Sequence, residues 1–133
     1  MVKEIIICIC IVGIILIGNY VTQNYTKEME KEMNEKLSYL KEELKKMEEE
    51  KEVDIENIEK EVDNINTIWK RRYKRLAYYI EHDELEKVEI YLVSFTSFVE
   101  MKQYVEAINE IDKCIFLLKH IEDKYSMSLE NIF

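Results

Sequence analysis

The hydrophobic and polar positions divide the chain into three stretches. Residues 5–26 carry no charged side chain, residues 27–64 are dominated by Glu and Lys, and residues 65–133 are richer in aliphatic and aromatic residues. Apolar residues in the last two stretches recur at spacings of three and four, which is typical of helices. The pattern predicts an all-α protein with an N-terminal membrane anchor (residues 1–26), a charged helical stalk (27–64) and a small helical bundle (65–133).

The uncharged run is long enough to cross a bilayer as one helix. At about 1.5 Å per residue, residues 5–21 span roughly 26 Å and residues 5–26 roughly 33 Å, close to the thickness of the hydrocarbon layer. Tyr20 and Tyr25 follow the apolar part, where amphipathic rings suit the headgroup layer. The side chains expected in lipid are those of Ile5, Ile6, Ile7, Ile9, Ile11, Val12, Ile14, Ile15, Leu16 and Ile17.

A cleaved signal peptide is the alternative to a permanent anchor. Lys3 precedes an apolar core of only 13 residues, as in a signal peptide, but no small-residue cleavage site follows Ile17. The sequence therefore favours an uncleaved, single-pass anchor in the cell membrane. The flank with more lysines usually stays in the cytoplasm, and by this rule the domain would be cytoplasmic. Large domains behind an N-terminal anchor are nevertheless commonly exported. We expect an extracytoplasmic domain.

The charged stretch is predicted to form a long helical rod. Glu32 and Lys36, and again Glu42 and Lys46, have the four-residue spacing that stabilises solvated helices. The thin apolar stripe takes a step of eleven residues between Leu44 and Ile55, which equals a heptad plus four and predicts a coiled-coil stutter. Such a rod would reach roughly 55 Å from the bilayer. It would either associate with a second copy or remain a solvated single helix.

The third stretch predicts a helical hairpin that completes a three-helix bundle with the end of the rod. Two apolar stripes are out of phase with one another, so the chain is expected to break near residues 100–103. Asp83 is expected to cap the hairpin's first helix. At the end of the chain, Ile132 and Phe133 are expected to close the bundle. The stripes comprise Leu85, Val88, Leu92, Phe95 and Val99, then Tyr104, Ile108, Ile111, Ile115 and Leu118.

Composition narrows the possible functions. The formal net charge of −9 disfavours nonspecific nucleic-acid binding. The chain has no proline, and its two glycines lie in the uncharged run, so no glycine-rich loop is available to cradle a phosphate. Catalytic motifs are also lacking. The three cysteines predict no disulfide framework. We therefore expect a protein that is not an enzyme and holds no cofactor.

A basic and aromatic segment is the main candidate for partner contacts. Five of residues 70–75 are Lys or Arg, and they can pair with acidic residues of neighbouring helices or bind an acidic partner or anionic headgroups. Contact with lipid would require the stalk to fold back. The contact candidates are Trp69, Tyr73, Tyr78, Tyr79, Arg71, Arg72 and Arg75.

Two histidines offer an alternative function. A hairpin turning near residue 101 would bring His82 and His120 to one end of the bundle, near Asp83 and Asp123. Two imidazoles with carboxylates could hold a divalent metal, although neither histidine has a ligand-type i, i+4 spacing. The alternative is therefore a membrane-tethered sensor or a module that binds a metal or small ligand.

The C-terminal half resembles a known family. Trp69, residues 80–85 with the sequence IEHDEL, and the ending SLENIF at residues 128–133 resemble short clostridial-type bacterial proteins that form the family called domain of unknown function 4363. The resemblance covers residues 69–133 and the N-terminal hydrophobic segment. It implies a membrane-associated helical protein without an assigned activity, and the charged stalk is longer than the resemblance implies.

These observations lead to one functional expectation. The protein should be a noncatalytic, membrane-anchored accessory or scaffold protein of the bacterial envelope. Its partners would be membrane lipid, contacted through the N-terminal helix, and an unidentified envelope or membrane protein. A second copy could associate through the stalk, and no nucleic acid is expected to bind.

Overall fold

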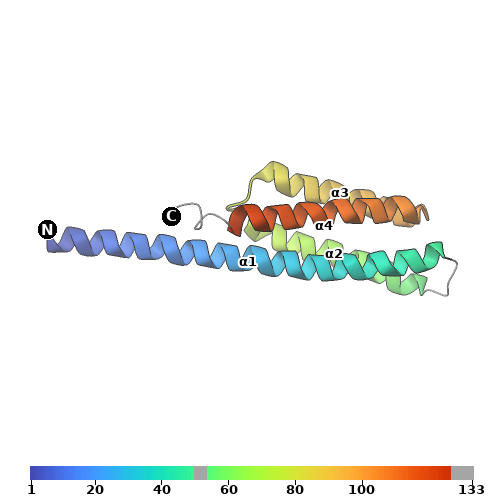
Figure 1. Ribbon diagram of the computed structural model, residues 1–133, viewed down its shortest axis with the longest axis horizontal. Coiled ribbons are helices and arrows are strands. Elements are labelled where there is room, and N and C mark those ends of the chain that lie inside the picture. The colour runs from blue at the N-terminus through green and yellow to red at the C-terminus, as the bar shows by residue number, and fades with distance from the viewer. Residues whose placement is uncertain (50–53, 127–133) are drawn as a thin grey trace.

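The computed structural model describes residues 1–49 and 54–126, and these residues form four α-helices (Figure 1). They are α1 (Val2–Glu48), α2 (Ile55–Leu76), α3 (His82–Glu100) and α4 (Tyr104–Ser126). No strand occurs in the described ranges. The prediction of an all-α protein with one long apolar N-terminal helix is confirmed.

Helix α1 has two parts with different surroundings. Residues 2–21, here called the N-terminal arm, project beyond the other helices (Figure 1), and their large apolar side chains are exposed. From Thr26 onward the same helix enters a bundle, where one face is fully buried. The buried apolar residues of this face are Met29, Met33, Leu37, Leu40 and Leu44. The helix is unbroken between the two parts.

The bundle is formed by the second part of α1 together with the other three helices. Helix α1 packs against α2 and α4, and α3 packs mainly against α4. Helix α2 runs antiparallel to α1, because Lys36 pairs with Glu61 while Glu32, earlier in α1, pairs with Arg72, later in α2. The remaining core side chains are Ile58, Val62, Ile65, Ile68, Trp69, Leu76, Ile80, Leu85, Val88, Leu92, Phe95, Ala107, Ile111, Cys114, Leu118 and Ile121.

The structure corrects the prediction of a separate charged stalk. Helix α1 ends at Glu48, and α2 starts again at Ile55, where the carboxylate of Asp54 accepts a hydrogen bond from the backbone N–H of Asn57 at 3.2 Å. The eleven-residue step from Leu44 to Ile55 is therefore a connection between antiparallel helices and not a coiled-coil stutter. Folding back removes the apolar stripe from water without a second chain, and this burial favours the reversal.

The predicted hairpin between α3 and α4 is confirmed. Helix α3 ends at Glu100 and α4 begins at Tyr104, with Lys102 between them in the left-handed conformation at φ 57°. Its backbone N–H donates to the carbonyl of Val99, and the N–H of Gln103 donates to that of Phe98, so the end of α3 is capped by the turn.

The start of α3 and the buried face of α4 differ from the prediction. Asp83 lies inside the first turn of α3, and Glu81 occupies the N-cap position instead.

On α4, three of the predicted stripe residues are only partly buried, because the centre of the buried face is shifted by one position. Cys114 therefore lies in the core. The partly buried residues are Tyr104, Ile108 and Ile115. The predicted closing residues Ile132 and Phe133 lie outside the described ranges.

A core substitution in the charged segment distinguishes a bundle helix from a free stalk. Leu37→Ala should lower the free energy of unfolding by about 2–5 kcal/mol, because Leu37 is fully buried among α1, α2 and α4. The exposed neighbour Ser38→Ala should change it by less than about 0.5 kcal/mol. The single tryptophan, Trp69, is buried, so its fluorescence can follow denaturation in detergent. Equal stabilities for the two variants would contradict the fold.

The position of Cys114 predicts an unreactive thiol. Burial raises the pKa of Cys114 to about 12, so the reactive thiolate is scarce near neutral pH. In a Cys8→Ser, Cys10→Ser background, iodoacetamide should modify Cys114 at least about a hundredfold more slowly in the folded protein than in denaturant. Mass spectrometry of the alkylated protein measures both rates, and similar rates would show that α4 does not bury this side chain.

Candidate functional site

The end of the bundle next to the N-terminal arm joins three parts of the chain. We call it the proximal end; it comprises residues 22–27 of α1, 74–83 and 119–126. The Tyr79 hydroxyl lies 2.9 Å from Oγ1 of Thr26 and donates to the carbonyl of Thr22 at 3.3 Å. The hydroxyl of Tyr125 accepts a hydrogen bond from the backbone N–H of Glu81 at 3.0 Å. Burial raises the pKa of Tyr79, so its hydroxyl stays protonated as a donor.

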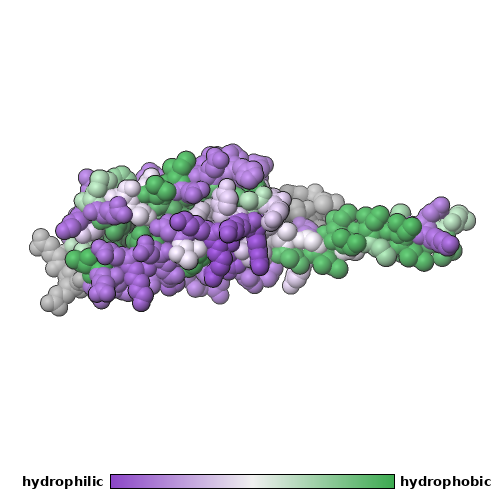
Figure 2. All heavy atoms as spheres, turned by 180° about the vertical axis from the view of Figure 1, so that it is seen from behind, coloured by the Kyte–Doolittle hydropathy of each residue, from purple (hydrophilic) through white to green (hydrophobic). Residues whose placement is uncertain are grey.

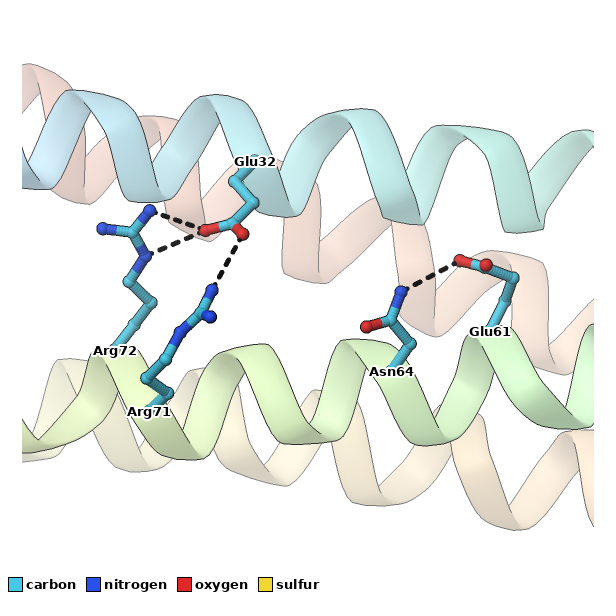
Figure 3. Close-up of polar contacts among 5 residues, drawn as sticks. All are labelled: Glu32, Glu61, Asn64, Arg71 and Arg72. Carbon is cyan, nitrogen blue, oxygen red and sulfur yellow. Dashed lines mark hydrogen bonds and ion pairs between the residues drawn. The ribbon is translucent and has the colours of Figure 1, made fainter.

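One carboxylate of α1 pairs with two arginines of α2. Figure 3 shows Glu32 reaching from α1 toward Arg71 and Arg72. Arg72 donates through Nε at 2.9 Å and Nη2 at 2.6 Å to one oxygen of Glu32, and Arg71 donates through Nη2 at 2.9 Å to the other. The Arg72 side chain is only 16% exposed, whereas that of Arg71 is 64% exposed. The predicted pairing of this basic segment with acidic residues is confirmed for these two arginines.

The ring of Tyr25 on α1 contacts two arginines of α2, Arg72 and Arg75. The guanidinium carbon of Arg72 lies 4.8 Å from the centre of the Tyr25 ring, and that of Arg75 lies 5.5 Å from it. Both distances are within the range of cation–π attraction. Burial lowers the pKa of Arg72, but its hydrogen bonds to Glu32 and its contact with Tyr25 outweigh this effect and raise it. The basic end of α2 is therefore fixed against α1 at the proximal end.

Further polar contacts connect the helices away from this end. Lys36 pairs with Glu61 at 3.1 Å, and the Asn64 amide, also drawn in Figure 3, donates to Glu61 at 3.5 Å. The Asn66 amide donates to the Thr96 hydroxyl at 3.2 Å and so links α2 to α3. The Lys36 and Asn66 contacts connect neighbouring helices, whereas the Asn64 contact lies within α2.

The predicted aromatic contact residues have different surroundings. Trp69 is only 3% exposed, and its indole N–H has no acceptor among the described residues. Tyr73 packs edge-on against Trp69 at 5.9 Å, and both Tyr73 and Tyr79 are partly buried. Tyr78 is 89% exposed in the turn after α2. Of these four rings, Tyr78 is the one that is mostly exposed.

The predicted contact residues did not include three other exposed apolar side chains. Ile90 and Val93 on α3 and Phe116 on α4 point away from the core, and Phe116 is 75% exposed. They lie outside the predicted core stripes, and this is the signal that could have identified them. Their exposure makes the α3–α4 side of the bundle a further candidate for partner contacts.

The two histidines do not form part of a metal site in the described ranges. His82 is the first residue of α3 and His120 lies near the end of α4, and both are exposed. The nearby carboxylates already have partners, since Asp83 pairs with Lys87 at 3.6 Å and Asp123 with Lys119 at 3.1 Å. Within residues 1–49 and 54–126, no group of three or more His, Cys, Asp or Glu side chains could hold a metal.

Other acidic residues at the proximal end are held by lysines of α4. Lys124 pairs with Glu81 at 3.3 Å and with Glu84 at 2.9 Å, and Lys119 pairs with Glu122 at 2.5 Å. These ion pairs raise the pKa of both lysines. Each of these two lysines is shared by two carboxylates, because Lys119 also pairs with Asp123 at 3.1 Å, so the ion pairs offset only part of the acidic charge on the α3–α4 side.

The bundle also has a cleft at its distal end, which is the end farther from the N-terminal arm. This cleft was not predicted from the sequence. All four helices or their connections contribute to its walls. Its lining residues are Met47, Ile55, Ile58, Glu59, Val62, Asp63, Thr96, Val99, Glu100, Lys102 and Tyr104. Its walls combine apolar side chains with three carboxylates and the Lys102 ammonium group.

Comparison with known proteins supports the resemblance noted in the sequence. A family model described as domain of unknown function, DUF4363, matches residues 17–132. The match extends well before residue 69, so the charged segment belongs to the family's domain and is not an added stalk. No curated protein and no solved structure matches the chain.

The pairing of Glu32 with Arg72 should stabilise the fold more than its pairing with Arg71. Hydrogen bonds to charged groups contribute about 1.5–3 kcal/mol, whereas exposed ion pairs contribute below about 1 kcal/mol. A double-mutant cycle with Glu32→Gln and Arg72→Gln, followed by chemical denaturation, should give a coupling energy in the first range. The matched cycle with Arg71→Gln should give one in the second. Equal coupling energies would contradict the different burial of the two arginines.

Proposed function

The chain belongs to the DUF4363 family, and for this member we propose a noncatalytic role as a single-pass membrane protein of the bacterial envelope. In this proposal α1 anchors the chain in the bilayer. The helical bundle acts at the membrane surface as an accessory or scaffold protein, through contacts with other proteins. The observation that carries the proposal is the two-part character of α1, which is exposed and apolar in its N-terminal arm and forms part of the core beyond it.

The N-terminal arm has the properties of a membrane-spanning segment. Among the described residues, α1 is the one helix that is long and apolar enough to cross a membrane, and its apolar part is not buried inside the protein. On the face drawn in Figure 2, the surface of the arm is hydrophobic except near its tip, and the surface of the bundle is mainly hydrophilic. A hydrophobic surface of this kind is unfavourable in water, and lipid removes it from water.

The continuity of α1 brings the bundle close to the bilayer. A hydrocarbon layer about 30 Å thick accommodates roughly 20 helical residues, which is the length of the arm. The first buried residue of the bundle is Thr26, about one turn beyond Val21. We therefore place the bundle directly above the headgroups. The stalk predicted from the sequence would instead have held it away from the membrane. We propose the extracytoplasmic side, because a large domain behind an N-terminal anchor is commonly exported.

Protein contacts are the activity that fits the surface of the bundle. Ile90, Val93 and Phe116 are exposed on α3 and α4, and Tyr78 is exposed beside the arm. Exposed aromatic and aliphatic side chains of this kind are frequent at protein interfaces. The ion pairs and hydrogen bonds described above connect the helices to one another, as suits a structural role.

Membrane association and orientation can be tested in cells. The full-length chain should remain with membranes after alkaline extraction and dissolve only in detergent, because the arm is held by lipid. Protease added to intact cells should digest the bundle if it lies outside the cytoplasm. Sequencing of the mature N-terminus is the control for signal-peptide cleavage. A mature chain beginning beyond Gly18, or release by cell lysis alone, would contradict the anchor.

Partner contacts can be tested by photo-crosslinking at native abundance. A photoreactive amino acid at Phe116 or Val93 should give adducts with another envelope protein or with a second copy of this chain. The same group at the exposed position Lys60 on α2 is the matched control. If the α3 and α4 positions yield no protein adduct, the scaffold role fails even where membrane anchoring holds.

A further inference from the structure

Helix α2 has opposite charges at its two ends. Residues 55–65 contain four acidic residues and one lysine, whereas residues 66–76 contain five basic residues and no acidic one. Because α2 runs antiparallel to α1, its basic half returns to the proximal end of the bundle. The fold therefore brings a strongly basic segment back toward the N-terminal arm.

The contacts with α1 define how far the basic half of α2 lies from the membrane-spanning arm. Arg75 lies over the ring of Tyr25, and Tyr79, just beyond the end of α2, contacts Thr22 and Thr26. Thr22, Tyr25 and Thr26 follow the end of the arm within about one and a half helical turns. If the arm spans the hydrocarbon layer, they lie in or just above the headgroup layer, which is roughly 5–7 Å thick on each side.

Several cations of this segment remain open to solvent. Lys70, Lys74 and Arg75 are exposed, and no ion pair engages them within residues 1–49 and 54–126. Arg71 is also mostly exposed, although it shares Glu32 with the more buried Arg72. Tyr78, the exposed ring of the proximal end, follows directly in the chain.

The acidic groups nearby do not cancel this charge. On the α3–α4 side, Lys124 pairs with Glu81 and Glu84, Lys119 pairs with Glu122 and Asp123, and Lys87 pairs with Asp83, so a small acidic excess remains there, away from the cations of α2. On α1, Lys27 and Lys31 balance Glu28 and Glu30 in number. The excess positive charge at the proximal end thus lies on the α2 side.

We infer that Lys70, Arg71, Lys74 and Arg75, together with Tyr78, form a basic surface that binds the anionic headgroups of the bilayer in which α1 is anchored. The inference rests on the proposed anchor and specifies how the bundle sits on the membrane. Lysine and arginine attract anionic lipid when held near its surface, and a tyrosine ring suits the headgroup layer. The surface tilts the α2 side of the bundle toward lipid and leaves the exposed apolar residues of α3 and α4 for protein contacts.

An acidic soluble protein fits this position less well than lipid does. The Arg75 end of the surface is held by α1 at the height of the headgroup layer, close to phosphate groups, because Arg75 lies over Tyr25. Lys70 and Arg71 lie farther from the arm, at the level of Glu32, and approach the phosphates when the α2 side tilts toward lipid. The attraction amounts to about fivefold in the binding ratio for each basic side chain near an anionic surface. Because the arm and the bundle move together, the two states are a molecule tilted onto the lipid and an upright one. Neutralising three of the basic side chains should change the ratio of tilted to upright molecules by roughly a hundredfold at low salt.

The test uses the full-length chain reconstituted into vesicles. His82→Cys in a Cys8→Ser, Cys10→Ser background carries a fluorophore at the proximal end, and Glu59→Cys carries it at the distal end as a control. A headgroup-attached quencher reports closeness to the membrane surface. Vesicles of phosphatidylcholine alone are compared with vesicles that also contain phosphatidylglycerol.

The expected result is stronger quenching at position 82 in anionic vesicles and little change at position 59. Lys70→Gln, Lys74→Gln and Arg75→Gln together should abolish the increase, as should salt at about 1 M, where the Debye length is only about 3 Å. A matched triple variant of distal lysines, Lys45→Gln, Lys60→Gln and Lys102→Gln, should retain it. Unchanged Trp69 emission and helical circular dichroism verify that each variant is folded.

Two outcomes separate this inference from the proposed anchor. If the protein floats with the vesicles but quenching at position 82 is equal in neutral and anionic lipid, or is unaffected by the proximal triple variant, the basic surface does not bind lipid and the inference is overturned. If the protein does not float with either vesicle, the anchor itself fails, and the inference fails with it.

Discussion

The unbroken helix α1 is the constraint on which the rest of the structure depends. Its N-terminal arm exposes apolar side chains in all directions, while its second part buries only one face. No residue between them breaks the helix, so the bundle cannot move independently of the arm in the way that a linker would allow. Helices α2 and α4 are placed relative to the arm by packing on the second part of α1, and α3 is placed mainly through α4.

The bundle combines a narrow apolar core with polar contacts between its helices. The chain is 35% charged, so only one face of each helix is available for the core. Glu32, Lys36 and Asn66 then connect neighbouring helices through ion pairs and hydrogen bonds. Such contacts add modest stability at a surface, but they also favour one register of α2 against α1, because a shifted register would leave half-buried charges such as Arg72 unpaired.

The antiparallel return of α2 also determines which surfaces are available for function. It buries Trp69, pairs Arg72 and brings the exposed cations of α2 to the proximal end. The α3–α4 hairpin is left with exposed apolar side chains on its outer side. One side of the bundle therefore suits a charged membrane surface, and another suits a protein partner.

Local patterns in the sequence determined much of this protein. They identified an all-helical chain, its long apolar N-terminal helix, the break near residues 100–103 and the buried residues of α3, because spacing and charge are properties of neighbouring residues. The reversal after Glu48 was decided only by tertiary packing. The stripe from Met33 to Leu44 has the same spacing in a coiled coil and in a bundle, so its pattern does not reveal which surface covers it. For the same reason, only the folded chain shows that Trp69 is buried while Tyr78 and the cations of α2 lie exposed beside the arm.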